Sequence, residues 1–165
     1  MSKLTDSLAF MKKVNSRELT ILKLLDKYNI NVSPKIININ ESSRIVTFIK
    51  YEKTLLECAY EQNAFFLNNI DIVINKVCNL INSLHAYNIV HGDIHADNIV
   101  INLLELEVKL VDFGMSINSD MVTDSYINMF NAMYRPLNKT CTFSDMKLYE
   151  TFYVKNLLRD ELCSR

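Results

Sequence analysis

The sequence predicts an α+β fold, and three observations support that prediction. Apolar residues make up 49% of the 165 residues and charged residues 22%, which is enough to bury one core and excludes a disordered tail. Helical periodicity dominates some stretches, whereas others are short runs of β-branched residues. Only two glycines occur, Gly92 and Gly114, which excludes Walker-type and dinucleotide-binding loops because these need repeated glycine. We expect one domain.

The charge balance excludes a broad electrostatic attraction to nucleic acid or to an anionic membrane. The chain carries 18 Lys and Arg against 19 Asp and Glu. No apolar run approaches the length of about 18 residues that could span a bilayer, and the apolar stretch 8–11 is too short for a signal sequence. We therefore expect a cytoplasmic protein with no nucleic acid partner and no membrane association.

The cysteines favour neither zinc nor disulfide bonds. They lie far apart, without a Cys-x-x-Cys pair, in a chain with no predicted signal sequence. We expect free thiols, mostly buried, at Cys58, Cys78, Cys141 and Cys163.

The first 51 residues predict one helix and a pair of strands. Apolar residues recur at helical spacing from Ser16 to about Tyr28, and Ser16 is the expected N-cap. Further on, two β-branched runs, 35–40 and 44–51, flank a short polar turn. This pattern predicts an antiparallel hairpin.

The middle of the chain predicts helices followed by a second strand pair. Apolar positions within 51–67 favour a short helix. From Ile70 to Leu84 the apolar face is so wide that a long helix should lie deep in the core. Residues 98–102 and 108–111 predict two short strands.

The last third of the chain predicts one more helix. A polar segment from Asn118 to about Ser144 carries no predicted element. The apolar positions from Met146 to Leu158 predict a closing helix, and Asp145 lies near its start, where a carboxylate suits the helix dipole.

Two motifs carry chemistry. The loop after the long helix reads His91-Gly92-Asp93-Ile94-His95-Ala96-Asp97-Asn98, and the second strand of the later pair leads into Asp112-Phe113-Gly114. A lone Asp-Gly is most often a turn, so the conjunction of both motifs, in this order, is the informative observation. They resemble the catalytic loop, His-x-Asp-x-x-x-x-Asn, and the metal loop, Asp-Phe-Gly, of the protein-kinase superfamily.

The resemblance implies a protein-kinase-like α+β fold with two lobes. A truncated small lobe, one helix plus a few antiparallel strands, would occupy about residues 1–51 of the single domain. A mainly helical, C-terminally shortened large lobe would occupy about residues 52–165. The eight residues before Ala9 are too few for the family's glycine-rich loop and the strands that bear it. We therefore expect a minimal kinase core.

The resemblance also implies roles for the motif residues. Asp93 matches the base that accepts the proton of the substrate hydroxyl. Asn98 and Asp112 match the ligands of Mg²⁺, which is expected as a cofactor together with ATP. His95 stands where protein Ser/Thr kinases have lysine, and it joins Asp93 and Asn98 among the catalytic candidates.

The other polar residues of the catalytic loop have simpler expected roles. His91 should be a packed, hydrogen-bonded residue, and Asp97 should be solvated rather than catalytic. Gly92 replaces the arginine that in many regulated kinases reads a phosphorylated activation loop. A phosphorylation switch through Thr123 or Ser125 is therefore not expected.

Weaker similarity extends to both sides of the motifs. Ala9-Phe10-Met11-Lys12 is similar to the Val-Ala-Ile-Lys strand, and the helix of Glu18 resembles the regulatory helix whose glutamate pairs with that lysine. Lys12 and Glu18 thus join Asn98 and Asp112 as cofactor-binding candidates. Since only five residues separate Lys12 from Glu18, a solvated lysine is an equally weighted alternative. Phe113 should pack against this helix, and Met133-Tyr134-Arg135-Pro136 is similar to the end of an activation segment.

Three functions follow from the resemblance. The first is an ATP-dependent protein Ser/Thr kinase of weak activity, because no glycine-rich loop shields the phosphates. The second is a catalytically weak or inactive kinase mimic that binds and regulates a host kinase, as viral truncated kinases do. The third is a small-molecule phosphotransferase of the aminoglycoside type. The segment His91-Gly92-Asp93-x-His95 resembles the catalytic loop of those enzymes. The expected partner is a protein substrate or a partner kinase, in the host cytoplasm if the protein is viral.

Overall fold

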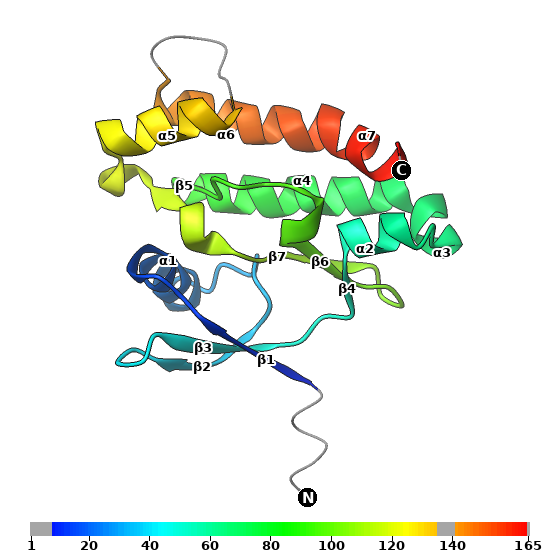
Figure 1. Cartoon of the computed structure of the whole chain (residues 1–165), viewed down its shortest axis with the longest axis horizontal. Helices are drawn as coiled ribbons and strands as arrows, with labels where there is room; N and C mark the ends of the chain where they lie inside the picture. Colours follow the sequence, from blue (N-terminus) through cyan, green and yellow to red (C-terminus); the bar gives the residue numbers. More distant parts are fainter. Residues whose placement is uncertain (1–7, 135–140, 165) are drawn as a thin grey trace, which may run out of the picture.

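The small lobe consists of a three-stranded antiparallel sheet and one helix (Figure 1). The computed structural model describes residues 8–134 and 141–164. Strand β3 (Ile45–Ile49) is central and pairs with β1 (Ala9–Lys13) and with β2 (Ile36–Asn40). Helix α1 (Ser16–Lys27) buries the apolar face that its periodicity predicted. The predicted hairpin and the predicted helix are both confirmed.

The N-cap of α1 is Asn15, so the prediction of Ser16 is wrong by one residue. Asn15 has an extended backbone, and its side-chain oxygen accepts a hydrogen bond from the Glu18 amide at 2.8 Å. This bond satisfies one of the amides that a helix start leaves without an intrahelical acceptor. Ser16 is the first helical residue instead.

The large lobe begins with a short strand and three helices. These are β4 (Lys53–Thr54), α2 (Leu55–Tyr60), α3 (Ala64–Asn68) and α4 (Ile70–Ala86). Helix α2 confirms the short helix favoured within 51–67, whereas α3, which starts from its own N-cap, Asn63, was not predicted. Helix α4 is long and buries one face along its whole length, as predicted.

Short strands frame the two motifs. The sheet of β4, β6 (Ile99–Asn102) and β7 (Glu107–Leu110) confirms the second strand pair, and β5 (Ile89–Val90) pairs with β8 (Ile117–Asn118). Two 3₁₀ turns, η1 (Ala96–Asn98) and η2 (Phe113–Met115), follow the positions of Asp93 and Asp112. The motifs are thus held between strands at the boundary of the two lobes.

The expectation of no element from Asn118 to Ser144 is wrong. A 3₁₀ turn, η3 (Ser119–Met121), leads into helix α5 (Asp124–Tyr134). Tyr126 and Phe130, one helical turn apart, are buried in a second small core. Arg135 and Pro136 of the proposed activation-segment end lie outside the described residues.

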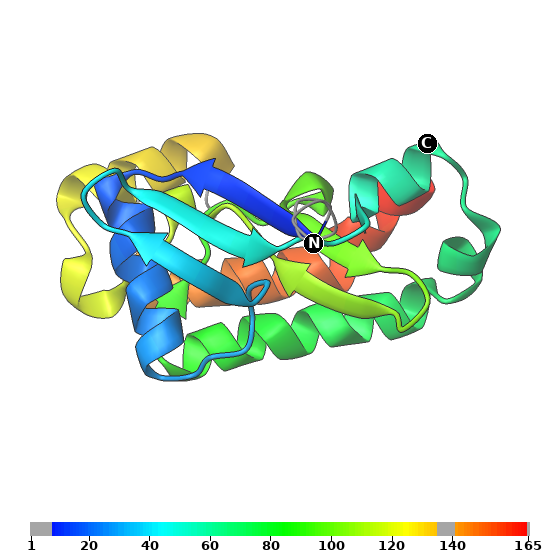
Figure 2. The same ribbon diagram turned by 90° about the horizontal axis from the view of Figure 1, so that it is seen from below.

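The closing helix is longer than predicted and forms an outer layer with α5. It consists of α6 (Phe143–Phe152), a π-helical turn η4 (Tyr153–Leu157) and α7 (Leu158–Cys163), which we call the C-terminal rod. Thr142 and Asp145 form a capping box at its start. Figure 1 shows the rod above α4, and Figure 2 shows the small-lobe sheet on the opposite side of the molecule.

One hydrophobic core runs through both lobes, from α1 and β3 to α4 and the end of the C-terminal rod. The four cysteines are free thiols as expected, but only Cys58 and Cys141 are buried. No helix among the described residues combines the length and the apolar character needed to cross a membrane.

Candidate active site

A cleft of about 460 Å³ lies between the two lobes. Its roof comes from β1 and β3, with Phe10 and Phe48, and its floor includes Val100 and Leu110. Pockets of this size that are mainly apolar and hold a few polar groups are typical small-molecule sites. The polar groups at its inner end are Lys12, Glu18 and Asp112.

Lys12 lies between two carboxylates. Its Nζ atom donates to Glu18 Oε1 at 2.9 Å and to Asp112 Oδ1 at 3.0 Å. The link between β1 and α1 is only two residues long, and it brings Lys12 directly against the first turn of the helix. The predicted pair of Lys12 and Glu18 therefore forms, despite the short spacing in sequence, and Lys12 is not a solvated terminal lysine.

Glu18 also ties the helix to the metal loop. Its side chain is only 4% exposed, and Oε1 accepts a hydrogen bond from the Phe113 amide at 3.1 Å. Asn15 donates from its side chain to the Gly114 carbonyl at 3.4 Å. Phe113 is buried against this region, as predicted.

The charges of this cluster stabilise one another. Burial alone would lower the pKa of Lys12, but its hydrogen bonds to Glu18 and Asp112 outweigh that effect and raise the pKa. Burial alone would raise the pKa of Asp112, but Lys12 and the Gly114 amide outweigh it and lower the pKa. The backbone of Asp112 is left-handed, with φ of 60°, a conformation that aspartate tolerates better than most residues other than glycine, and it turns the chain from β7 into η2.

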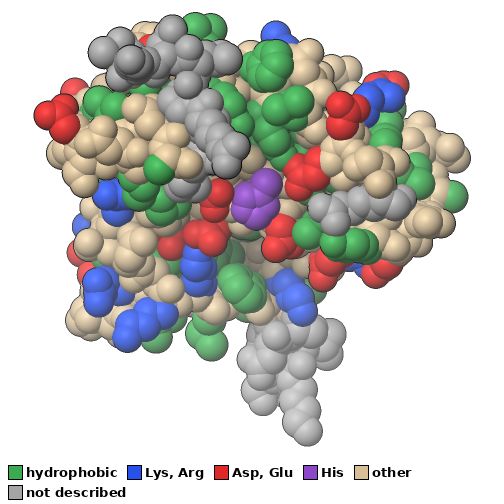
Figure 3. Space-filling model, turned by 45° about the horizontal axis from the view of Figure 1, so that its top comes forward, with side chains coloured by type: hydrophobic (Ala, Val, Ile, Leu, Met, Phe, Trp, Pro, Cys, Tyr) green, Lys and Arg blue, Asp and Glu red, His purple; other side chains and the backbone are tan. Residues whose placement is uncertain are grey.

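Asp93 and Asn98 are brought together by the catalytic loop. Asn98 Nδ2 donates to the Asp93 carbonyl at 2.9 Å and to Asp93 Oδ2 at 3.2 Å. His95 Nε2 lies 3.6 Å from the same carboxylate oxygen. Figure 3 shows a histidine in the hollow of one face, with acidic side chains around it; His95 is the most exposed of the three histidines.

His91 and Asp97 have the simpler roles that the sequence predicts. The His91 ring is fully buried, with Nε2 at 2.9 Å from the Val111 carbonyl and Nδ1 at 3.3 Å from the Asp93 amide. Burial lowers the pKa of His91, against smaller opposing effects of Glu150 and the Val111 carbonyl. The neutral ring thus links the catalytic loop to the metal loop, whereas Asp97 is exposed.

Glu150 of the C-terminal rod is a site residue that sequence reasoning missed. It is only 2% exposed, and its two oxygens meet His85 Nε2 at 2.7 Å and the Gly92 amide at 2.7 Å. The one available signal was a carboxylate on the apolar face of an amphipathic helix. The sequence drew attention to Asp145 instead, which serves as a helix cap.

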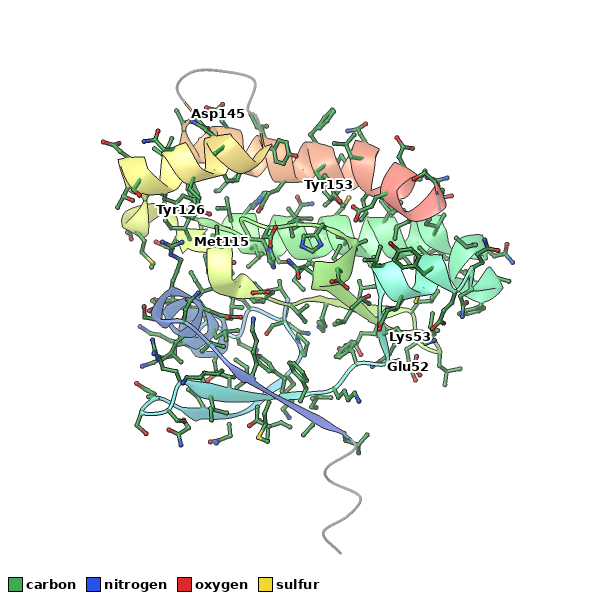
Figure 4. The ribbon with its side chains drawn as sticks, in the orientation of Figure 1. Glu52, Lys53, Met115, Tyr126, Asp145 and Tyr153 are labelled. Carbon is green, nitrogen blue, oxygen red and sulfur yellow. The ribbon has the colours of Figure 1, made fainter. Side chains whose placement is uncertain are left out.

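Gly92 is required by close approach of its neighbours. Its φ is +83°, and an added Cβ would lie 2.2 Å from the Met115 carbonyl oxygen and 2.6 Å from the Tyr126 hydroxyl. That hydroxyl donates to the same carbonyl at 2.6 Å, and Met115 and Tyr126 meet where η2 faces α5 (Figure 4). Tyr126 therefore occupies the space beside Gly92, where a larger side chain has no room.

The side chains of Asp112 and Asn98 are of the kinds that suit Mg²⁺. This cation prefers oxygen ligands and retains water or phosphate oxygens in part of its coordination shell. Asp112 offers a half-exposed carboxylate, and Asn98 keeps its side-chain carbonyl oxygen while its nitrogen bonds Asp93. No group of three or more His, Cys, Asp or Glu residues fit for a metal occurs among the described residues. The residues thus fit a cation shared with phosphate oxygens rather than one enclosed by protein.

The chain is similar to two curated relatives that are named as EKC/KEOPS complex subunits. It is 30% identical over 125 residues to BUD32 of Debaryomyces hansenii, which covers 68% of this chain and 47% of the relative. It is 26% identical over 97 residues to bud32 of Dictyostelium discoideum, which covers 58% of this chain and 38% of the relative. The matches thus span less than half of each relative.

A solved structure and a family match agree with this similarity. The Cydia pomonella granulovirus kinase PK-1 superposes with a TM-score of 0.60 and 16% identity, over 95% of this chain and 59% of that one, which shows the fold. The family described as "Protein kinase domain" matches residues 3–135, which include β1, α1 and both motifs. With this match over most of its length, the chain belongs to the protein kinase family.

Proposed function

We propose that this protein is an ATP-dependent protein kinase that transfers the γ-phosphoryl group to a serine or threonine hydroxyl of a protein substrate. The observation that carries the proposal is the position of Lys12, bonded to Glu18 and Asp112 at the inner end of the cleft. This arrangement would present a lysine to the phosphates of ATP beside a carboxylate that would hold Mg²⁺. The similarity to proteins named as kinases supports the hypothesis of a protein kinase.

Each of the candidate site residues has a role in the proposed reaction. Lys12, oriented by Glu18, would bind the phosphates of ATP, and Asp93 would accept the proton of the attacking hydroxyl. Asn98, which bonds the Asp93 carboxylate, would orient it, and His95, 3.6 Å from the same carboxylate, would contact the substrate. When bound to Asn98 and Asp112, Mg²⁺ neutralises charge on the phosphates. We expect weak ATP affinity, because β1 is the edge strand of the described sheet and Phe10 is half exposed over the cleft.

The test measures Mg²⁺-dependent ATP binding and phosphoryl transfer together. ATP with Mg²⁺ should raise the melting temperature of the wild type, and Asp112→Ala should abolish that shift. Asp93→Ala should retain binding but reduce kcat for a protein acceptor such as casein by about 10²- to 10⁴-fold. Asp97→Ala is the matched control, since it removes an exposed carboxylate from the same loop.

The other two functions give different results in the same experiment. No thermal shift with ATP and Mg²⁺, together with no effect of Asp112→Ala on transfer, would contradict the enzyme proposal. Co-purification with a cellular kinase that survives Asp93→Ala would then support a kinase mimic. Transfer to kanamycin but not to casein would identify a small-molecule phosphotransferase.

A further inference from the structure

The end of the C-terminal rod touches the catalytic loop. Glu161 of α7 is half buried, and its Oε1 atom accepts a hydrogen bond from the Ala96 amide at 3.2 Å. Its other oxygen, Oε2, accepts a hydrogen bond from the Tyr153 hydroxyl. Tyr153 belongs to the same rod, on the side that faces the layer below it (Figure 4). The Tyr153 hydroxyl therefore fixes the position of the Glu161 carboxylate, which accepts the hydrogen bond of the Ala96 amide.

The Ala96 amide needs this acceptor. Ala96 is the first residue of η1 and is fully buried, so its N–H has no acceptor within the turn and little access to water. A buried amide without a partner costs about 1–3 kcal/mol. Glu161 supplies a charged acceptor, which makes a stronger hydrogen bond than a neutral one.

The turn that Glu161 caps carries the residues of the proposed reaction. The Asn98 amide donates to the His95 carbonyl at 3.0 Å and closes η1. Asn98 in turn bonds both the carbonyl and the carboxylate of Asp93. A shift of Ala96 would therefore also shift Asp93, because the two residues are connected through the hydrogen bonds of η1 and Asn98.

We propose that Glu161 is a positioning residue for the catalytic loop, acting through the Ala96 amide. This inference rests on the proposed kinase function. The opposite end of the loop is held in the same way, by Glu150 on the Gly92 amide. Two carboxylates of the C-terminal rod thus accept hydrogen bonds from the two ends of the catalytic loop. The rod thereby fixes the distance between the ends of the loop and the orientation of the Asp93 side chain.

Replacing Ala96 by proline isolates this contact from other effects of Glu161. Proline has no N–H and is tolerated at the first position of a helical turn. It also requires an extended residue before it, and His95 is extended, with φ of −158° and ψ of 169°. Ala96→Pro thus removes the donor and rigidifies the same turn, so Glu161 should no longer matter in this background.

The experiment compares Glu161→Ala, Glu161→Gln, Ala96→Pro and the double variant Glu161→Ala with Ala96→Pro. Glu161→Ala should lower kcat about tenfold, the effect of one charge-assisted hydrogen bond, with KM for ATP changed less than about twofold. Amide exchange of a peptide covering 94–98 should become about tenfold faster, with exchange of α4 unchanged. Glu161→Gln keeps an acceptor oxygen and should restore most of both values. Asp160→Ala, an exposed carboxylate on the same helix, should change neither.

Two results would overturn the proposal. One is unchanged exchange of 94–98 in Glu161→Ala. The other is a further tenfold loss when Glu161→Ala is added to Ala96→Pro, because Glu161 would then act elsewhere. If the wild type transfers no phosphoryl group, the proposed function fails, whereas the exchange measurement still decides whether Glu161 holds the loop.

Discussion

Glu18 is the most deeply buried carboxylate of the cluster around Lys12, and its charge needs the lysine as a partner. Its side chain is 4% exposed and that of Lys12 is 29% exposed. Removing one partner of a buried ion pair leaves the other charge without compensation, which costs more than the pair itself contributes. The same contact that would orient Lys12 toward phosphates therefore also stabilises the small lobe.

Lys12→Met should accordingly lower the free energy of unfolding by about 1–3 kcal/mol, less than for a fully buried pair because Lys12 is partly solvated. It should also abolish the thermal shift with ATP and Mg²⁺. Lys13→Met, which replaces the exposed neighbour on β1, is the control and should change neither quantity. Equal stability of the two variants in urea titrations would contradict this interpretation of the cluster.

The burial of His91 predicts how the stability of the protein changes with pH. Burial lowers its pKa in the folded protein below the value of about 6.5 for an exposed histidine. The unfolded chain thus binds a proton more readily than the folded one, so the stability from a neutral His91 is complete above about pH 6.5 and is lost as pH falls toward the folded pKa. The loss reaches at most about 1.4 kcal/mol per pH unit.

A comparison of the wild type with His91→Gln measures this contribution. Glutamine does not titrate, so the stability advantage of the wild type should be largest at pH 8 and should shrink between pH 6.5 and pH 5. Urea titrations at each pH give the free energies of unfolding. An advantage that stays constant with pH would mean that His91 does not lose its charge on folding.

At the scale of elements, sequence patterns predicted what depends on local periodicity. Helices α1 and α4, the hairpin of β2 and β3, and the strand pair that leads to Asp112 follow from apolar spacing and β-branched runs. Helix α5 was missed although Tyr126, Met129 and Phe130 recur at helical spacing and pack in the second core, because polar residues on both sides made residues 118–144 look like one polar segment. A short apolar face is thus overlooked when the pattern is judged over a stretch longer than the helix itself.

Within the site, sequence identified motif residues but not those that hold them. Asp93, Asn98 and Asp112 belong to a contiguous pattern with fixed spacing. Glu150 and Glu161 act on the loop from far along the chain, through contacts with backbone amides. Every residue except proline can supply a backbone N–H, so no side-chain pattern in the loop indicates its distant acceptor.

The start of α1 provides a test at this scale. Asn15→Ala should lower the free energy of unfolding by about 1 kcal/mol, because it removes the bond to the Glu18 amide and with it the cap. Ser16→Ala should have an effect close to zero, since alanine is favourable within a helix and Ser16 is not the cap. Thermal unfolding of both variants distinguishes the two positions, and a larger loss for Ser16→Ala would restore the cap that the sequence suggested.

For the whole molecule, the relative position of the lobes depends on contacts that cross between them. Lys109 of β7 is only 6% exposed, and its Nζ atom donates to the carbonyl and side-chain oxygens of Asn31, at 3.1 Å and 2.7 Å, in the link between α1 and β2. The adjacent Leu110 amide donates to the Val32 carbonyl at 2.8 Å. Val32 and Leu110 belong to the core shared by both lobes, so these contacts adjoin that core.

Because that core is continuous, we expect the two lobes to unfold in one cooperative transition. Lys109→Met should lower the free energy of unfolding by about 1–3 kcal/mol and the melting temperature by about 3–8 °C, because the Asn31 oxygens lose a charged donor. Exposed Lys35 provides the matched variant, Lys35→Met, which should unfold as the wild type does. Calorimetry checks both points: two separate transitions in the wild type would contradict a continuous core, and equal behaviour of the two variants would remove Lys109 from the connection between the lobes.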